Sequence, residues 1–458
     1  MNNVNPFTNR IDMPRPSPGV HDEMYAWMRD LFPICRSITG PGVRETMAYL
    51  GEILPGLQIH EVPTGTECFD WTVPDEWSIR DAFIADEAGE RIIDFQANNL
   101  HVMSYSTPVD AKMTLEELEP HLYSLPEQPD AIPYISSYYT PRWGFCLSEQ
   151  QRSRLKPGNY HVVIDSTLAP GSLTYAELLL PGREEKEILL SAYTCHPSMA
   201  NDNLSGVVVL TALARWLADQ TDRRYSYRIV FLPETIGSIV YLSRNLAAMR
   251  AHTIGGYVLS CIGDDRNYTF QETRWADTLV DRISRHVMTH HAPDFTTSTY
   301  LERGSDERQY SSPGADLPIA LIMRSRFDAF PEYHTSLDDL SLASPAGLGG
   351  GFEALRKCIA AFESNYYFRT AQPCEPQLGK RGLYPDLNTK TLPHSVRDIV
   401  NFLAFADGTL DLIALADRIE LPFETCVGFA HALLAEGVVE ASATPWPAER
   451  APTGVTPS

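Results

Sequence analysis

Residues 187–218 read EILLSAYTCHPSMANDNLSGVVVLTALARWLA, and the fold assignment starts from this stretch. Its first part, residues 187–193, is an almost continuous apolar run, which is typical of a strand covered on both faces. Its last part, residues 203–218, places apolar residues at helical spacing after a polar loop. The stretch therefore predicts a buried strand, a loop and a helix, the repeating unit of an α/β fold.

The same alternation continues along the chain. Apolar runs at 228–232 (RIVFL), 255–261 (GGYVLSC) and 317–323 (LPIALIM) predict further buried strands, and residues 238–251 have a helical pattern. We therefore expect an α/β domain in which a mostly parallel sheet is flanked by helices.

Regions outside this alternation predict several domains, as the length of 458 residues also suggests. Short β-type runs and many aromatic residues mark residues 61–170 as a β-rich insert, and three helical patterns near the C-terminus are typical of a winged helix. The predicted organisation is a flexible arm (1–20), a discontinuous α/β domain (21–60 and 171–368), the insert (61–170), a linker (369–386), a winged-helix domain (387–446) and a tail (447–458).

Composition restricts the class of protein. Hydrophobic residues make up 43% and charged residues 21%, as in ordinary globular proteins, and the net charge of −22 repels nucleic acid and anionic membranes. We see no apolar run of about 18 residues and no export signal, so we expect no membrane span. Eight cysteines without a CxxC pair do not form a disulfide framework, which favours a cytoplasmic protein.

Polar residues follow the end of each predicted strand. His196 and Glu234 come soon after two of the strands, Asp264 and Asp265 after the third, and His334 in the loop after the last. Ligands bind at the carboxyl ends of strands in such sheets, so we expect these segments to converge on one edge.

A metal site is the chemistry that this convergence favours. His196, Asp202 and His334 offer two imidazoles and a carboxylate, a normal ligand set for catalytic zinc. Asp338 or Asp339 is expected to accept the other ring N–H of His334. The alternative for Asp202 is a cap on the following helix.

Glu234 is predicted to act as the general base toward metal-activated water, and the alternative is a solvated residue at a strand end. Cys195 beside His196 suggests a Cys–His nucleophile. We reject that interpretation because neighbours on a strand point to opposite faces.

The charged segment RGSDERQY at residues 303–310 could contribute to substrate binding. Arg308 could hold a substrate carboxylate with two hydrogen bonds, and Asp306 or Glu307 could receive an amine. A solvated loop is the alternative. The aromatic stretch from Tyr138 to Trp143 could cover the cleft or lie in the core of the insert.

The order of His196, Asp202, Glu234 and His334 resembles the zinc aminopeptidases that use co-catalytic metals. In that family a His, a bridging Asp, a Glu–Glu pair, a further Asp and a late His surround two zinc ions. The resemblance implies that His196, Asp202 and His334 are ligands and that Glu234 is the base.

This chain departs from that pattern at three positions. Thr235 stands where the second Glu is expected, Ser260 or Cys261 where the further Asp is expected, and Ser198 two residues after the first His. These departures favour one zinc ion over two.

More narrowly, the chain resembles a bacterial aminopeptidase-like family with a β-rich insert and a C-terminal winged helix. The phrases that carry this resemblance are TCHPSMANDNLSG (194–206), PETIGS (233–238), RGSDERQY (303–310) and YHTSLDD (333–339). Members are associated with polysaccharide or secondary-metabolite pathways.

The predicted winged helix does not favour a nucleic-acid partner. Residues 380–450 carry six basic and ten acidic residues, and residues 423–436 contain no Lys or Arg. Phosphate contacts, which supply most nucleic-acid affinity, are therefore scarce, and we expect a packing or dimerisation module.

The sequence as a whole favours a zinc-dependent amide hydrolase acting on a small peptide or an amino-acyl or acylated amino-sugar conjugate. Two alternatives remain open: an iron site with two His and one carboxylate, and a catalytically degenerate scaffold that binds a ligand or partner protein.

Overall fold

A computed structural model of the chain describes residues 17–383 and 394–447. The chain divides into two compact units. The larger contains residues 17–281 and Asp294–Glu353, and the smaller contains Arg282–Pro293 and the described residues from Ala354 onward. Most of the predicted arm and tail, and the end of the predicted linker, lie outside the described residues.

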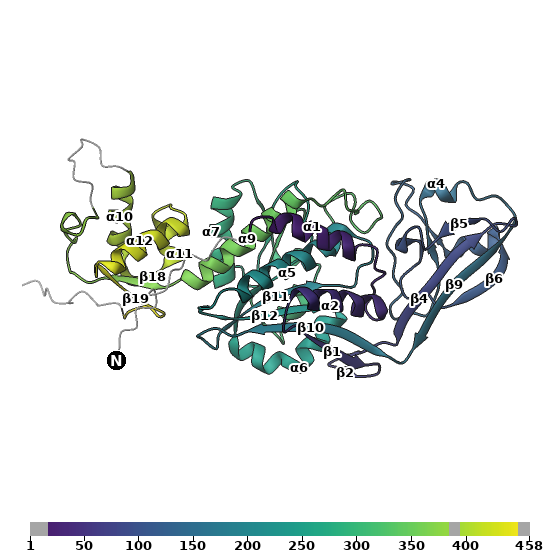
Figure 1. Ribbon diagram of the computed structural model, residues 1–458, viewed down its shortest axis with the longest axis horizontal. Coiled ribbons are helices and arrows are strands. Elements are labelled where there is room, and N and C mark those ends of the chain that lie inside the picture. The colour runs from purple at the N-terminus through teal and green to yellow at the C-terminus, as the bar shows by residue number, and fades with distance from the viewer. Residues whose placement is uncertain (1–16, 384–393, 448–458) are drawn as a thin grey trace, which may run out of the picture. The chain divides into compact units, whose positions relative to one another are not determined.

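The larger unit is built on an eight-stranded sheet, in which β11, β12, β13 and β16 run parallel (Figure 1). Residues of β11 are buried on both faces, as the apolar pattern predicted. The expected mostly parallel α/β sheet is thus confirmed. In spatial order its strands are β1 (Gln58–Pro63), β10 (Ser172–Leu180), β12 (Ser226–Leu232), β11 (Glu187–Tyr193), β13 (Thr253–Val258), β16 (Ile319–Met323), β14 (Thr269–Gln271) and β15 (Thr296–Ser298).

Helices cover both faces of this sheet because of the order of its strands. The chain moves from β11 to β12 through α5 (Ser205–Ala218) and then back across β11 to β13 through α6 (Ile236–His252). Since such crossovers are right-handed, the two helices fall on opposite faces. Outside the predicted insert, the other helices that lie wholly in the larger unit are α1 (Val20–Leu31), α2 (Pro41–Ile53) and α8 (Glu307–Tyr310). The division between the units falls within α7 (Leu279–His291) and α9 (Pro345–Ser364).

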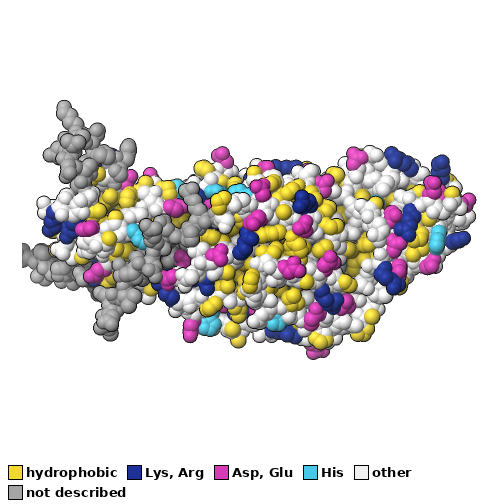
Figure 2. Space-filling view, viewed as in Figure 1, with side chains coloured by type: hydrophobic (Ala, Val, Ile, Leu, Met, Phe, Trp, Pro, Cys, Tyr) yellow, Lys and Arg dark blue, Asp and Glu magenta, His cyan; other side chains and the backbone are white. Residues whose placement is uncertain are grey.

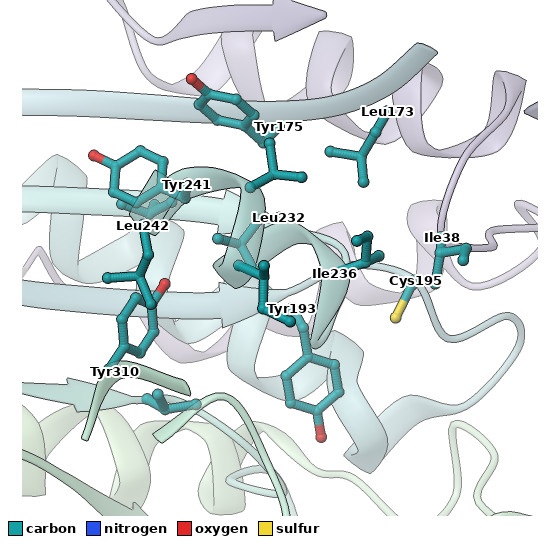
Figure 3. Close-up of a cluster of buried hydrophobic side chains, with 14 of the residues drawn as sticks. Ile38, Leu173, Tyr175, Tyr193, Cys195, Leu232, Ile236, Tyr241, Leu242 and Tyr310 are labelled. Carbon is teal, nitrogen blue, oxygen red and sulfur yellow. The ribbon is translucent and has the colours of Figure 1, made fainter. Parts of the chain in front are cut away.

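Apolar packing between α6 and the sheet positions the segment that carries the first predicted metal ligand. Figure 3 shows Tyr175, Leu232 and Tyr241 in one buried cluster, with Ile38 and Cys195 at its edge. Cys195 directly precedes His196, so this core fixes the end of the segment that carries the first predicted metal ligand.

The region predicted as a β-rich insert contains a four-stranded antiparallel sheet in the order β5-β4-β9-β6. Its core includes Ile84, Phe145 and Val162. The strands of this region are β2 (Glu67–Cys68), β3 (Trp71–Thr72), β4 (Glu76–Ala85), β5 (Arg91–Asp94), β6 (Val109–Thr114), β7 (Leu122–Tyr123), β8 (Phe145–Cys146) and β9 (Asn159–Ala169), and its helices are α3 (Leu115–Leu118) and α4 (Glu149–Arg152).

The smaller unit contains a three-stranded antiparallel sheet of order β18-β17-β19, the helices α10, α11 and α12, and the later parts of α7 and α9. The predicted linker (369–386) therefore starts too early, since its first residues belong to a strand that pairs with the later wing strands. The elements are β17 (Tyr367–Thr370), α10 (His394–Phe405), β18 (Asp407–Asp411), α11 (Leu412–Arg418), α12 (Phe423–Ala435) and β19 (Val439–Ser442).

Charged side chains of both signs are mixed on the surface. On the face shown in Figure 2, Lys and Arg side chains stand among Asp and Glu side chains. Within the described part of the chain, none of the helices combines the length and the apolar character that a membrane crossing requires.

Candidate metal centre and active-site cavity

The three predicted metal ligands come together at one edge of the sheet. His196 lies three residues beyond β11, Asp202 lies in the irregular turn η3 (Ala200–Leu204) before α5, and His334 lies in the loop after β16. Asp202 Oδ2 is 3.0 Å from His334 Nε2 and 3.8 Å from His196 Nε2. One ligand atom from each residue lies within 4.8 Å of the others, which is close enough for a single ion to contact all three.

The polar atoms of this group fit a metal ion. Apart from their 3.0 Å contact with each other, the buried atoms Asp202 Oδ2 and His334 Nε2 have no hydrogen-bond partner, although such atoms normally have one. The donor set of two imidazoles and one carboxylate suits zinc with a further position for water. The residues present are therefore compatible with the metal that the sequence predicts.

Protonation at these residues also suits a metal ligand set. Burial lowers the pKa of His196 to about 4, although attraction to Asp202 opposes that shift. Burial by itself raises the pKa of Asp202, but His196, His334 and the Tyr193 hydroxyl outweigh it and bring that pKa down to about 2. A neutral His196 and an ionised Asp202 are the forms that coordinate metals.

Asp202 is held in place by contacts that the sequence did not suggest. Its Oδ1 accepts a hydrogen bond from the Tyr193 hydroxyl, which lies 2.8 Å from Ser260 Oγ. Ser260, at the position where a further acidic ligand is expected, thus supports a ligand indirectly. The carboxylate does not cap α5, since the helix begins at Ser205, whose hydroxyl donates to the Asn201 carbonyl at 2.6 Å.

The predicted role of Asp338 and Asp339 needs correction. Asp338 Oδ1 and Oδ2 accept hydrogen bonds from the backbone N–H groups of Asn201 (2.6 Å) and Asp202 (2.8 Å). Asp339 accepts from the backbone and hydroxyl of Ser341. Neither carboxylate receives the ring N–H of His334, because both are already engaged by neighbouring backbone groups.

Asp264 and Asp265, the acidic residues that follow β13, are engaged by neighbouring polar groups. Asp264 accepts hydrogen bonds from Asn201 Nδ2 and from the backbone and hydroxyl of Ser325. Asp265 accepts from the Ser344 hydroxyl. These contacts tie the loop after β13 to its surroundings.

Glu234 lies beside the predicted ligands. It follows β12, and one of its carboxylate oxygens lies within 4.8 Å of ligand atoms of Cys195 and His196. Burial and repulsion from Asp306 and Asp202 raise the pKa of Glu234 well above its usual value. A carboxyl group in such a position is able to hold and release a proton close to the predicted metal.

Cys195 is closer to His196 than strand alternation predicts. Its Sγ lies 3.4 Å from His196 Nδ1, because β11 ends at Tyr193 and the alternation of side chains stops there. Cys195 Sγ also accepts the backbone N–H of Glu234 at 3.3 Å. Burial raises the pKa of the Cys195 thiol well above its usual value, which disfavours the thiolate that a nucleophile needs.

A cavity of about 350 Å³ opens onto these residues. Its lining joins two of the predicted ligands, His196 and His334, to aromatic residues from the insert. The lining residues are Ile38, Trp71, Tyr134, Ser136, Tyr138, Tyr139, Cys195, His196, Glu234, Thr235, Ile236, Arg308 and His334.

Some residues of the aromatic stretch from Tyr138 to Trp143 line the cavity, and others pack in the core of the insert. Tyr138 and Tyr139 line the cavity. Trp143 instead stacks on His121 with ring centroids 3.6 Å apart and packs against the insert core. The insert therefore supplies one wall of the cavity.

The insert is fastened to the loop that carries His334. The backbone N–H of Tyr134 donates to the His334 carbonyl at 2.8 Å, and that of Ser336 donates to the Ile132 carbonyl at 2.9 Å. The Tyr134 ring lies 5.2 Å from the His196 ring and 5.3 Å from the His334 ring. Sequence reasoning missed Tyr134, since nothing in its local pattern distinguishes it from other tyrosines of the insert.

The charged segment before β16 contributes one residue to the cavity, Arg308. Asp306 Oδ1 instead accepts from the backbone N–H of Thr235 (2.8 Å) and the Ser238 hydroxyl (2.7 Å). The structure does not bring Glu307 to the cavity, because its buried carboxylate accepts hydrogen bonds from Gln271 and from backbone groups of its own loop.

Zinc aminopeptidases share this α/β fold. A solved zinc aminopeptidase from Bacillus subtilis has a TM-score of 0.56 and 12% identity, covering 77% of this chain and 96% of that chain. The likeness places the larger unit in the aminopeptidase fold, as the sequence predicted. A winged helix-turn-helix family model matches residues 365–441, which confirms the C-terminal winged helix.

The chain belongs to the family described as "Domain of unknown function (DUF4910)", whose model matches residues 25–365. A relative from Clostridium acetobutylicum, provisionally described as a polysaccharide biosynthesis protein with an aminopeptidase-like domain, is 48% identical over 79% of this chain and 83% of its own length. A crystal structure from the same species, provisionally described as a peptidase, is 42% identical with a TM-score of 0.88, covering 93% of this chain and 98% of that chain.

Proposed function

We propose that the protein is a metal-dependent hydrolase that cleaves an amide bond in a small peptide or in an amino-acyl or acylated amino-sugar conjugate. The observation that carries this proposal is the convergence of His196, Asp202 and His334 within 4.8 Å, beside a cavity that also holds Glu234. The zinc aminopeptidase fold supports peptidase-like chemistry. The polysaccharide biosynthesis description of the Clostridium relative supports an amino-sugar amide as one substrate class.

In the proposed mechanism, His196, Asp202 and His334 would hold one zinc ion. When bound, zinc lowers the pKa of water and polarises a substrate carbonyl. Glu234 takes a proton from the attacking water and returns it to the leaving nitrogen as the carbon–nitrogen bond breaks. The oxygen of water ends on the acyl carbon, so the products are a carboxylic acid and an amine.

Two alternatives use the same residues differently. A two-His, one-carboxylate iron site would share the ligands, and a binding scaffold would need neither the metal nor a base. The position of Glu234 on the cavity favours the hydrolase, because a binding scaffold does not require a proton-transferring group beside the ligands.

Elemental analysis of the full chain, purified without chelator or nickel resin, tests the metal. We expect about one zinc per chain, as in mononuclear catalytic sites. Iron would favour the alternative with a two-His, one-carboxylate iron site, and no metal after soaking with zinc would favour the binding scaffold.

Glu234→Gln tests the base, with the exposed Glu116→Gln in the insert as its control. Glu234→Gln should keep its zinc and lose amide hydrolysis by roughly 10²–10⁴-fold, the usual contribution of general acid–base catalysis. Normal turnover in Glu234→Gln would remove Glu234 from this role.

We also propose that the winged-helix domain serves packing or dimerisation. Its helix α12 (Phe423–Ala435) contains no Lys or Arg, so it offers no cation for phosphate contacts. Light scattering of the full chain and of a Phe405→Asp variant, which changes an exposed apolar residue of α10, tests this role.

A further inference from the structure

We propose that the substrate carries a carboxylate, which Arg308 binds, and that the site does not select a free amino terminus. This inference rests on the proposed function, since it names the substrate class of the same cavity. Arg308 is the one Lys or Arg among the described residues that line that cavity.

The guanidinium of Arg308 is positioned but only partly satisfied. Its Nη2 donates a hydrogen bond to Thr235 Oγ1, which fixes one edge of the group. Its Nε is buried without a hydrogen-bond partner. Within the described chain, Arg308 makes no ion pair with a carboxylate at 4.0 Å or less. A buried, unsatisfied donor of a planar guanidinium suits an external carboxylate, which accepts two parallel hydrogen bonds.

Neighbouring carboxylates do not take the place of that ligand. Asp306 directs Oδ1 to the start of α6, where it accepts from Thr235 and Ser238. Glu307 is committed to Gln271 and its own loop. Arg308 therefore forms no ion pair within 4.0 Å with a carboxylate of its own segment, although its charge attracts Asp306 and Glu234, and the second oxygen of Asp306 is buried without a hydrogen-bond partner.

The cavity offers little to a substrate ammonium group. Glu234 is the one carboxylate among its described lining residues, and the proposed mechanism already uses that carboxylate as the base. An ammonium group buried without an acceptor would lose its hydration without compensation. The charges of the lining thus favour an N-acylated acid over a peptide with a free amino terminus.

The aromatic part of the cavity lining suits the uncharged body of such a molecule. Trp71 and Tyr139 meet edge to face with ring centroids 5.6 Å apart, and they remain 39% and 52% exposed. Exposed aromatic faces at a cavity bind apolar groups and ring systems. The complementary ligand therefore joins a carboxylate to a ring or apolar group through an amide.

Calorimetric titration of the full chain tests this inference with N-acetyl-L-phenylalanine, its neutral carboxamide and the cationic L-phenylalaninamide. The Glu234→Gln background prevents turnover, so binding is measured whether or not the protein is a hydrolase. We expect the carboxylate to bind at least about tenfold more tightly than either amide, as a charge-assisted bidentate contact would give.

Variants of Arg308 and of a control arginine test whether Arg308 causes the preference for the carboxylate. Arg308→Gln should remove it, Arg308→Lys should keep part of it, and Arg303→Gln, an exposed arginine of the same loop, should keep all of it. Equal binding of the three probes, preference for the cationic amide, or an undiminished carboxylate preference in Arg308→Gln would overturn the proposal. The last result would assign the carboxylate to the metal. If the parent protein hydrolyses no amide but the Glu234→Gln protein shows the expected binding preference, only the proposed function is contradicted.

Discussion

The carboxylate of Asp338 accepts the backbone N–H of Asp202 at 2.8 Å, so one buried carboxyl group positions another that is a predicted metal ligand. The second carboxylate oxygen of Asp338 accepts a hydrogen bond from the backbone N–H of Asn201. The backbone carbonyl of Asp338 accepts one from the backbone N–H of Ala200. Three successive backbone groups of the turn before α5 therefore depend on this single residue.

Asp338→Asn should weaken metal binding without removing any ligand. An amide nitrogen replaces one acceptor and faces a backbone donor, so the turn that carries Asp202 must shift. We expect roughly a 10–100-fold loss of zinc affinity, as is common when residues that orient metal ligands are changed. Competition with a chromophoric chelator measures this loss. The partly exposed Asp339→Asn is the control, and unchanged affinity in Asp338→Asn would show that the turn does not depend on Asp338.

His334→Ala should lower zinc occupancy directly. Its Nε2 lies 3.0 Å from Asp202 Oδ2 and has no other partner, so the substitution removes one of three predicted ligands. Elemental analysis after dialysis should give well under one zinc per chain. His161→Ala, in the insert, should retain the metal. Full occupancy with unchanged affinity in His334→Ala would place the metal site elsewhere.

Trp71→Ala should weaken the binding of substrates that contain a ring. Trp71 reaches the cavity from the short strand β3, whereas the neighbouring Phe69 is 64% exposed and does not line it. An aromatic pair contributes about 0.5–1.5 kcal/mol beyond burial, so KM should rise several-fold with little change in kcat. Phe69→Ala is the matched control. An equal effect of the two substitutions would show that the hairpin, rather than its ring, matters.

The position of polar residues after predicted strands was enough to predict the metal ligands, but not the residues that hold those ligands in place. His196, Glu234 and His334 each follow a strand whose apolar pattern is visible in the sequence, and parallel strands bring such positions to one edge. Tyr193 Oη, which supports Asp202, belongs to a buried strand and looks like core. Asp338 lies close to His334 in sequence, yet its carboxylate turns to the distant segment 200–202, which local spacing does not reveal.

The contribution of the insert to the cavity could not be predicted from the sequence either. Its β pattern is visible, but Tyr134 reaches the ligands only because residues 132–134 pair with the loop around His334. That pairing depends on tertiary contacts between segments about 200 residues apart. Cys195 illustrates a smaller error, since the alternation that was expected to separate it from His196 ends with the strand.

Asp411→Asn should destabilise the smaller unit. Arg282 Nη1 and Nη2 donate to the two oxygens of Asp411 at 3.0 and 2.7 Å, and Asn365 Nδ2 donates to the same carboxylate. Asp411 also caps α11 through the backbone N–H of Ala414. Because Arg282 is partly exposed, we expect a loss of about 1–2 kcal/mol in the free energy of unfolding.

The effect of Asp411→Asn should depend on pH. Burial by itself raises the pKa of Asp411, but the hydrogen bonds from Arg282 and Ala414 outweigh it and lower that pKa below its usual value. A depressed pKa means that the carboxylate stabilises the fold above the unfolded pKa of about 4 and that this contribution is lost as pH falls toward the folded pKa. Urea unfolding at pH 7 and at pH values below 4 should show the difference between the parent and Asp411→Asn shrinking on acidification. The exposed Glu436→Gln should show no such trend, and a pH-independent difference would mean that the carboxylate acts through its shape and not its charge.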